Sequence, residues 1–310
     1  TGRASTYNNN EVFTINSKLP INTLNHKDIV KSLISSAIKH HREEVDLDYF
    51  HNAKLAQTVD ELKENYLKTY YATIDLIDKK NLQGLIVFNG RIDVTRAAID
   101  AAKYAKINFL THDRPFTGHG IQIHVNENIL GLNSRFNINS KFDDKPLTND
   151  QAQLAGKEIA KRFLGKNILE WRIYNLGFNK LQKWPISTND YKILIAPSSV
   201  SERAGHEDWK TPWKLATDGF DLFLKSIRVK KNQVVVRFHP NWIEKRGKSK
   251  GQSARQHYKS WCQSNSYLYI DCNEKISTID LIDKCDVLVL NGSTAAIEGG
   301  SLGKKIVNIG

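Results

Sequence analysis

One stretch near the end of the chain combines a strand, a tight turn and the start of a helix. It reads DVLVLNGSTAAIEGGSLG and spans residues 286–303. The apolar run up to Leu290 is typical of a buried parallel strand, Asn291-Gly292 is typical of a turn, and residues 295–302 are predicted to be helical. A helix N-terminus placed directly after a strand offers unpaired N–H groups and partial positive charge, which suit a phosphate. The simpler alternative is a capped helix within an α/β core.

Polar side chains lie at the N-terminus of this predicted helix. Ser293 or Thr294 is a suitable N-cap, and Glu298 follows one turn further in. A second stretch, VVVRFHP at residues 234–240, strengthens the phosphate hypothesis, because it predicts another strand that ends in His239-Pro240. Together the two stretches predict hydroxyl and imidazole donors at neighbouring strand ends.

The second half of the chain alternates predicted strands and helices. Strands are expected at 192–196, 233–238, 267–270, 286–290 and 305–309, and helices lie between them. This alternation predicts a parallel sheet, whose ligands bind beyond the carboxyl ends of the strands. The residues expected at that edge are Ser198, Ser199, His239, Asp271, Asn291, Gly292, Ser293 and Thr294.

The first half contains a second α/β unit. Helices are expected at 29–40, 60–79, 94–105 and 149–164, a short buried strand at Gly84–Phe88, and further strands at 107–110 and Gln122–Val125. Residues 126–150 are interpreted as loop, apart from the start of the last helix. Because residues 165–190 are irregular, we expect two domains, 1–175 and 176–310.

Composition limits the class of protein. The chain has 310 residues, of which 40% are hydrophobic and 25% charged, as in globular proteins. No run approaches the ~18 apolar residues of a membrane span, and no secretory signal is recognised. The three cysteines lack CxxC spacing, so a reducing, cytoplasmic location is expected, with peripheral contact at the inner membrane face. Because the sequence stops directly after a strand-like segment, we expect the natural chain to continue past Gly310.

The charge balance predicts anionic partners. The formal net charge is +12, which favours nucleotides, acidic glycans or lipid headgroups. Neither GxGxxG nor GxxxxGK[ST] occurs, and there is no metal-ligand spacing. The basic segment 245–255 has no interleaved aromatic residues, so nucleic acid is not an expected partner. We therefore expect neither a metal nor another cofactor.

Four segments together resemble a known enzyme family. They span residues 87–115, 193–202, 234–241 and 291–310, about a quarter of the chain. In this order they are similar to the bacterial capsule and lipopolysaccharide glycosyltransferases of the GT-B type. Within these, the capsule-synthesis family that includes Kdo transferases is nearest, and bacterial sialyl- and polysialyltransferases are more distant.

The resemblance implies two Rossmann-like domains with parallel sheets facing across a cleft. The N-terminal domain would bind the acceptor glycan or glycolipid, and the C-terminal domain a nucleotide-sugar, with CMP favoured. It implies transfer of a sugar, foremost Kdo from CMP-Kdo, to a growing capsule or lipopolysaccharide glycan without a metal. His239, Ser293 and Thr294 would hold the donor phosphate and Glu298 the ribose or base, with the rest of the donor site formed by Ser198, Ser199, Pro240, Asn291 and Gly292.

The catalytic carboxylate has two candidates. Glu202 matches the Ser-Ser-x-x-acid segment of the family, whereas Asp113 ends a strand of the other domain, and Glu202 is slightly preferred. Arg91 and Arg114 are candidate contacts to an acidic sugar or acceptor. For all four, a purely structural role is the alternative.

Two other activities share the expected fold. A nucleotide-sugar 2-epimerase would turn over its donor with no acceptor present. A sialyltransferase would use CMP-sialic acid in place of CMP-Kdo.

Overall fold

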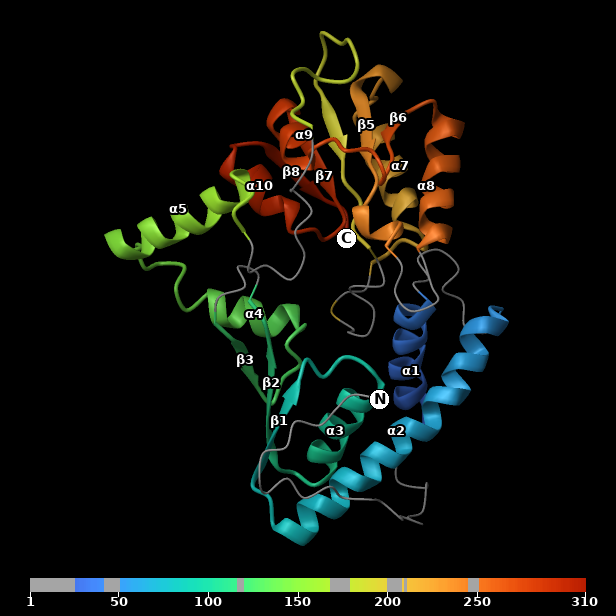
Figure 1. Ribbon diagram of the computed structural model, residues 1–310, viewed down its shortest axis with the longest axis vertical. Coiled ribbons are helices and arrows are strands. Elements are labelled where there is room, and N and C mark those ends of the chain that lie inside the picture. The colour runs from blue at the N-terminus through green and yellow to red at the C-terminus, as the bar shows by residue number, and fades with distance from the viewer. Residues whose placement is uncertain are drawn as a thin grey trace.

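The computed structural model describes residues 26–41, 51–115, 120–167, 179–199, 208, 211–244 and 251–310. Glu202, a candidate catalytic carboxylate, and the basic positions 245–250 lie outside these residues. Within the described residues the strands form two sheets, one of three strands and one of five (Figure 1).

The C-terminal sheet is entirely parallel. Its strands are β4 (Ile193–Ile195), β5 (Val234–Arg237), β6 (Leu268–Ile270), β7 (Val287–Leu290) and β8 (Lys305–Asn308). They lie in the order β6-β5-β4-β7-β8. This is the doubly wound order, in which the chain works outward from the centre in one direction and then in the other. The order reverses between β4 and β7, and ligands bind at such a point in open α/β sheets.

Helices cover both faces of this sheet. Ile193, Ile195 and Val236 pack into one core, and the alternate residues Leu194 and Val235 pack into a second core on the opposite face. The covering helices are α7 (Ala216–Ser226), α8 (Gln252–Asn265), α9 (Thr278–Lys284) and α10 (Ala295–Ser301). Burial on both faces explains why these strands are continuous apolar runs.

The N-terminal sheet has the order β1-β2-β3. Strands β1 (Gly84–Phe88) and β2 (Asn108–Asp113) are parallel and are joined by helix α3 (Asp93–Tyr104), as predicted. Strand β3 (Gln122–Val125) instead runs antiparallel to β2. The connection between them spans only residues 114–121, which is too short for a parallel crossover of about a dozen residues.

Strand β1 corrects one expectation. We predicted a buried strand, but the side chain of Ile86 is 74% exposed and that of Phe88 is 51% exposed. Helices α1 (His26–His41) and α2 (Ala53–Lys80) pack with α3, and the buried strand residues Val87 and Phe109 pack against α3. In the described part of the chain, helices therefore cover only one face of this sheet.

Helix α4 (Leu132–Asn139) lies in a segment that we interpreted as loop. Its sequence LNSRFNIN has low helix propensity, so the local pattern gave no signal. The Oδ2 atom of Asp208 accepts hydrogen bonds from the backbone N–H groups of Leu132, at 2.8 Å, and Asn133, at 3.2 Å. The start of α4 is thus capped from a distant part of the sequence, which no local pattern could reveal.

Helix α5 (Asn149–Phe163) was predicted within one residue. The side chains of Thr148 and Gln151 form a reciprocal capping box at its start. None of its residues is buried, and in Figure 1 it projects beside α10. Tertiary packing therefore supports α5 much less than the other long helices.

Candidate functional site

The reversal point of the C-terminal sheet joins Ser198 to Asn291. Ser198 follows β4, and Asn291 follows β7. The Ser198 N–H donates to Asn291 Oδ1 at 2.7 Å, and the Ser198 hydroxyl donates to the Asn291 carbonyl at 3.0 Å. Both residues are buried. These bonds fix the two strand ends to each other at the place where the fold predicts a ligand.

The turn after β7 is held in a single conformation. Gly292 has φ of +85°, which favours glycine, and its N–H donates to Asn308 Oδ1 at 2.8 Å. The Ser293 hydroxyl accepts from the N–H of Ala295, the first residue of α10, at 3.2 Å, whereas the N-cap residue Thr294 makes no side-chain cap hydrogen bond. Thr294 is the last residue before that helix.

One donor in this turn is unsatisfied. Among the described residues, Asn291 Nδ2 is buried and makes no hydrogen bond. An unmet buried donor costs about 1–3 kcal/mol, so a folded protein keeps one only for a reason. An acceptor oxygen of a ligand at the reversal point would satisfy Asn291 Nδ2.

His239 begins a turn of 3₁₀-helix, Pro240–Trp242. Its Nδ1 accepts from the Asn241 N–H at 3.2 Å. A neutral imidazole that accepts at Nδ1 carries its proton on Nε2, so this bond assigns Nε2 as the donor. Trp242 is fully buried beneath the turn and stacks on Tyr258 with ring centroids 4.8 Å apart. The His239 ring centroid is 6.4 Å from that of Trp242, and the bond from Asn241 orients the imidazole.

Strand register brings these residues to one edge. Ile195 of β4 lies opposite Val236 of β5 and Val289 of β7. Ser198, His239 and Gly292 each follow these three positions by three residues. The sheet thus presents them from three adjacent strands, with β4 in the centre.

Arg237 helps to hold the segment next to His239 in place, and our sequence analysis missed it. It is 2% exposed and donates to the carbonyl oxygens of Asp271 at 2.5 Å and of Glu274 at 3.2 Å. Burial lowers the pKa of its guanidinium. These bonds tie the end of β5, next to His239, to the connection after β6. A charge inside the apolar run VVVRF was the available signal.

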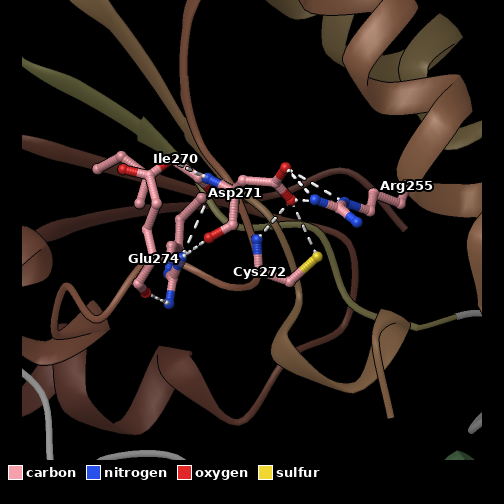
Figure 2. Close-up of polar contacts among 6 residues, drawn as sticks. Arg255, Ile270, Asp271, Cys272 and Glu274 are labelled. Carbon is pink, nitrogen blue, oxygen red and sulfur yellow. Dashed lines mark hydrogen bonds and ion pairs between the residues drawn. The ribbon is translucent and has the colours of Figure 1, made fainter. Parts of the chain in front are cut away.

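Asp271 lies at the expected edge but is already engaged. Figure 2 shows its carboxylate facing Arg255, which donates from Nε to Oδ1 at 2.8 Å and from Nη2 to Oδ2 at 2.6 Å. Burial alone would raise the pKa of Asp271, but hydrogen bonds from Arg255 and Cys272 hold it below its usual value. Arg255, the last residue of the basic segment 245–255, lies in the first turn of helix α8, which starts at Gln252.

Glu298 pairs with a residue from the first half of the chain. Arg162 of α5 donates to Glu298 Oε1 through Nε, at 2.8 Å, and through Nη2. Glu298 is 5% exposed. Its other oxygen, Oε2, is buried and has no hydrogen-bond partner among the described residues. Because 136 positions separate the two residues, no sequence pattern indicated this pair.

Asp113, Arg91 and Arg114, the candidates from the first half of the chain, lie at or just after the ends of strands β1 and β2 of the N-terminal sheet. Asp113 ends β2 and accepts from Asn89 Nδ2 at 2.5 Å and from the Arg114 N–H at 2.7 Å. Arg91 is buried, Arg114 is exposed, and Ser199, at the other sheet, is fully buried. Glu202, the other candidate carboxylate, is outside the described residues.

The described residues contain no group of three or more His, Cys, Asp or Glu side chains that could hold a metal ion. Within the same residues, every helix is too short or too polar to cross a membrane.

Comparisons with known proteins give similarities in fold. The KpsC β-Kdo 2,4 transferase of Thermosulfurimonas dismutans has 18% identity and a TM-score of 0.47, over 73% of this chain and 68% of that one. The β-Kdo 2,7 transferase of the same organism has 14% identity and a TM-score of 0.38, over 79% and 74%. The UDP-GlcNAc 2-epimerase of Neisseria meningitidis, solved with UDP-GlcNAc, has 15% identity and a TM-score of 0.33, over 80% of this chain and 64% of that one.

No protein-family model matches the chain, and no curated protein matches it. At such low identities and TM-scores, the similar structures carry no conclusion about chemistry. The α/β fold, with a doubly wound parallel sheet, rests on the strand order and register of the chain itself.

Proposed function

We propose that this chain is a glycosyltransferase of the GT-B type that moves a sugar from a nucleotide donor to a growing capsule or lipopolysaccharide glycan. The observation that carries the proposal is the reversal point between β4 and β7. There the bonded pair Ser198–Asn291 leaves one buried amide donor unmet, and His239 follows β5, the strand that pairs with β4. Of the possible donors we favour CMP-Kdo, because of the motifs that resemble Kdo transferases.

The proposed chemistry stabilises a leaving phosphate by hydrogen bonds. As the glycosidic bond breaks, negative charge develops on the nucleotide, and donors already fixed in position stabilise it at little reorganisation cost. His239 Nε2–H and Asn291 Nδ2 are suited to that task, and the Thr294 hydroxyl is a further candidate. Helix α10 has only seven residues, so side-chain donors matter more here than the helix dipole.

The acceptor is assigned to the N-terminal part. Asp113 stands at the edge of its sheet, where Asn89 orients the carboxylate. We propose Glu202 or Asp113 as the general base or nucleophile, and Arg91 and Arg114 as contacts to an acidic sugar. The proposal divides the chain at residue 175 into an acceptor domain and a donor domain. It also places the enzyme at the cytoplasmic face of the inner membrane, where such acceptors are found.

Transfer assays test this proposal. The protein would be incubated with CMP-Kdo, CMP-sialic acid or UDP-GlcNAc, with and without a glycan acceptor, and the products identified by mass spectrometry. We expect sugar transfer that requires the acceptor and is greatest with CMP-Kdo. Epimerised donor in the absence of acceptor would identify a 2-epimerase instead. If the protein turns over none of the three donors, the proposal is overturned.

A further inference from the structure

The ion pair between Arg162 and Glu298 has a geometry that is not needed merely to join helices α5 and α10. Both donor atoms of Arg162 approach the same oxygen, Oε1. The second oxygen, Oε2, is buried and unbonded among the described residues. A bidentate pair that served only to join two helices would use both carboxylate oxygens. Here the guanidinium fixes the carboxylate plane and leaves one acceptor unused.

The surroundings of the pair also need explanation. Helix α5 has no buried residue, so it gains little from apolar packing. Even so, the side chains of Arg162 and Glu298 are only 13% and 7% exposed. Burying two charges is costly unless their remaining hydrogen-bonding capacity is also met. Oε2 lacks this, and Glu298 lies one turn beyond the phosphate-side residues Ser293 and Thr294.

A nucleotide supplies the missing donor. A ribose carries two adjacent hydroxyls, on C2′ and C3′, and its ring is joined to the phosphate through C5′ and O5′. Glu298 lies four residues after Thr294, the N-cap of α10, so it is one helical turn from the residues proposed to face the phosphate. A hydroxyl bonded to a desolvated carboxylate oxygen forms a strong, charge-assisted hydrogen bond.

We propose that Arg162 is the positioning residue that holds Glu298 for the donor ribose, so that α5 sets ribose recognition without itself touching the substrate. This inference rests on the proposed nucleotide site. It assigns to a helix from the first half of the chain a role in binding at the second sheet. Arg162 acts only through Glu298, and this indirect action is what the experiment must detect.

The experiment measures the affinities of CMP and 2′-deoxy-CMP by titration calorimetry. Wild type is expected to bind CMP about tenfold more tightly, the effect of one good hydrogen bond. Arg162→Gln and Glu298→Gln should each reduce that ratio to near one and raise KM for the donor more than they change kcat. Because Arg162→Gln leaves a buried carboxylate uncompensated, Arg162→Gln/Glu298→Gln is included to remove both charges. Its ratio should equal that of Glu298→Gln alone.

Arg96→Gln is the matched control. Arg96 pairs with Asp100 on α3, with Nε–O distances of 2.9 and 3.0 Å, far from the proposed site in sequence and in sheet. This variant should keep the wild-type ratio. Arg162→Lys keeps the charge but loses the guanidinium fork, so an intermediate ratio is expected.

The outcomes separate this inference from the proposed function. If wild type binds CMP and Arg162→Gln keeps both its affinity and its ribose preference, the inference is wrong while the proposed function stands. If Arg162→Gln changes the preference for CMP over UMP but not the ribose preference, Arg162 acts on the base and the inference is again overturned. If wild type binds no nucleotide, the proposed function fails with it.

Discussion

The His239 side chain has two hydrogen-bonding tasks at once. Its Nδ1 accepts from the Asn241 N–H and so shapes the turn after β5. The same bond leaves the proton on Nε2, which makes that atom a donor for an incoming anion. The two nitrogens can therefore be tested separately, because an asparagine side chain reproduces Nδ1 but not Nε2.

We predict that His239→Asn keeps the fold and loses transfer. Its Oδ1 can accept from the Asn241 N–H, so the melting temperature should stay close to that of wild type. Loss of one preorganised donor to a developing charge should lower kcat by about 10²–10³. His239→Ala removes both functions and should also melt earlier. Near wild-type turnover by a well-folded His239→Asn would show that Nε2 takes no part in catalysis.

Sequence patterns predicted some of the candidate site at this scale. Ser198 and Asn291 were found because residues that follow adjacent parallel strands must share an edge. Arg162 could not be found, since its partner is 136 positions away and a surface helix commonly carries Arg. Asn308 also escaped notice, because its bond to Gly292 depends on the pairing of β7 with β8.

At the scale of elements, an ion pair links helix α8 to the end of β6. Arg255 and Asp271 form it, and their side chains are 35% and 15% exposed. Arg237 binds the same connection from the other side through backbone carbonyls. The connection after β6 is thus fixed next to the His239 turn.

We predict that the stabilisation from Asp271 disappears in acid. Its pKa is lower in the folded chain than the value of about 3.9 in an unfolded one. The contribution is therefore present in full above about pH 4 and is lost as the pH falls through the folded pKa. Asp271→Asn should lower the free energy of unfolding at pH 7 by about 1–2 kcal/mol. The partial exposure of the ion pair keeps this loss small.

Denaturant melts at several pH values provide the measurement. The difference between wild type and Asp271→Asn should shrink below about pH 4. Asp190→Asn, which breaks the exposed pair with Lys230, serves as the control and should change stability little at any pH. A difference that stays constant from pH 7 to pH 3 would refute the assignment to the Asp271 carboxylate.

Helices and strands were predicted correctly where the apolar pattern was strong. The prediction failed where contacts between residues distant in sequence determine the local structure. Strands β1 and β3 have the predicted bounds because turn residues flank short apolar runs. Helix α4 was missed because Asp208, about 75 positions away, caps it. The direction of β3 follows from a connection too short for a crossover, a length that the sequence showed but that we did not use.

At the scale of the whole molecule, the two sheets have separate cores. Buried residues of α1, α2 and α3 form one, and those around β4 and β5 form others. Described contacts that connect the two parts are the Asp208 cap of α4 and the Arg162–Glu298 pair. Both are polar contacts.

We predict that transfer requires no divalent metal. Hydrogen-bond donors at His239 and Asn291 would stabilise the negative charge on the leaving phosphate in place of a cation. Turnover should change less than about twofold when EDTA is added, within the range of an ordinary medium effect. The initial rate of donor consumption is the measurement. Activity that EDTA abolishes and that magnesium or manganese restores would contradict the prediction.

The central claim is that the carboxyl edge of the C-terminal sheet binds the donor nucleotide. Amide hydrogen exchange, followed by mass spectrometry with and without saturating CMP, tests it most directly. We predict slower exchange in peptides that cover residues 198–199, 239–242 and 291–298, and unchanged exchange in β1, β2 and β3. Protection confined to the N-terminal sheet, or none with CMP, UDP or GDP, would contradict the claim.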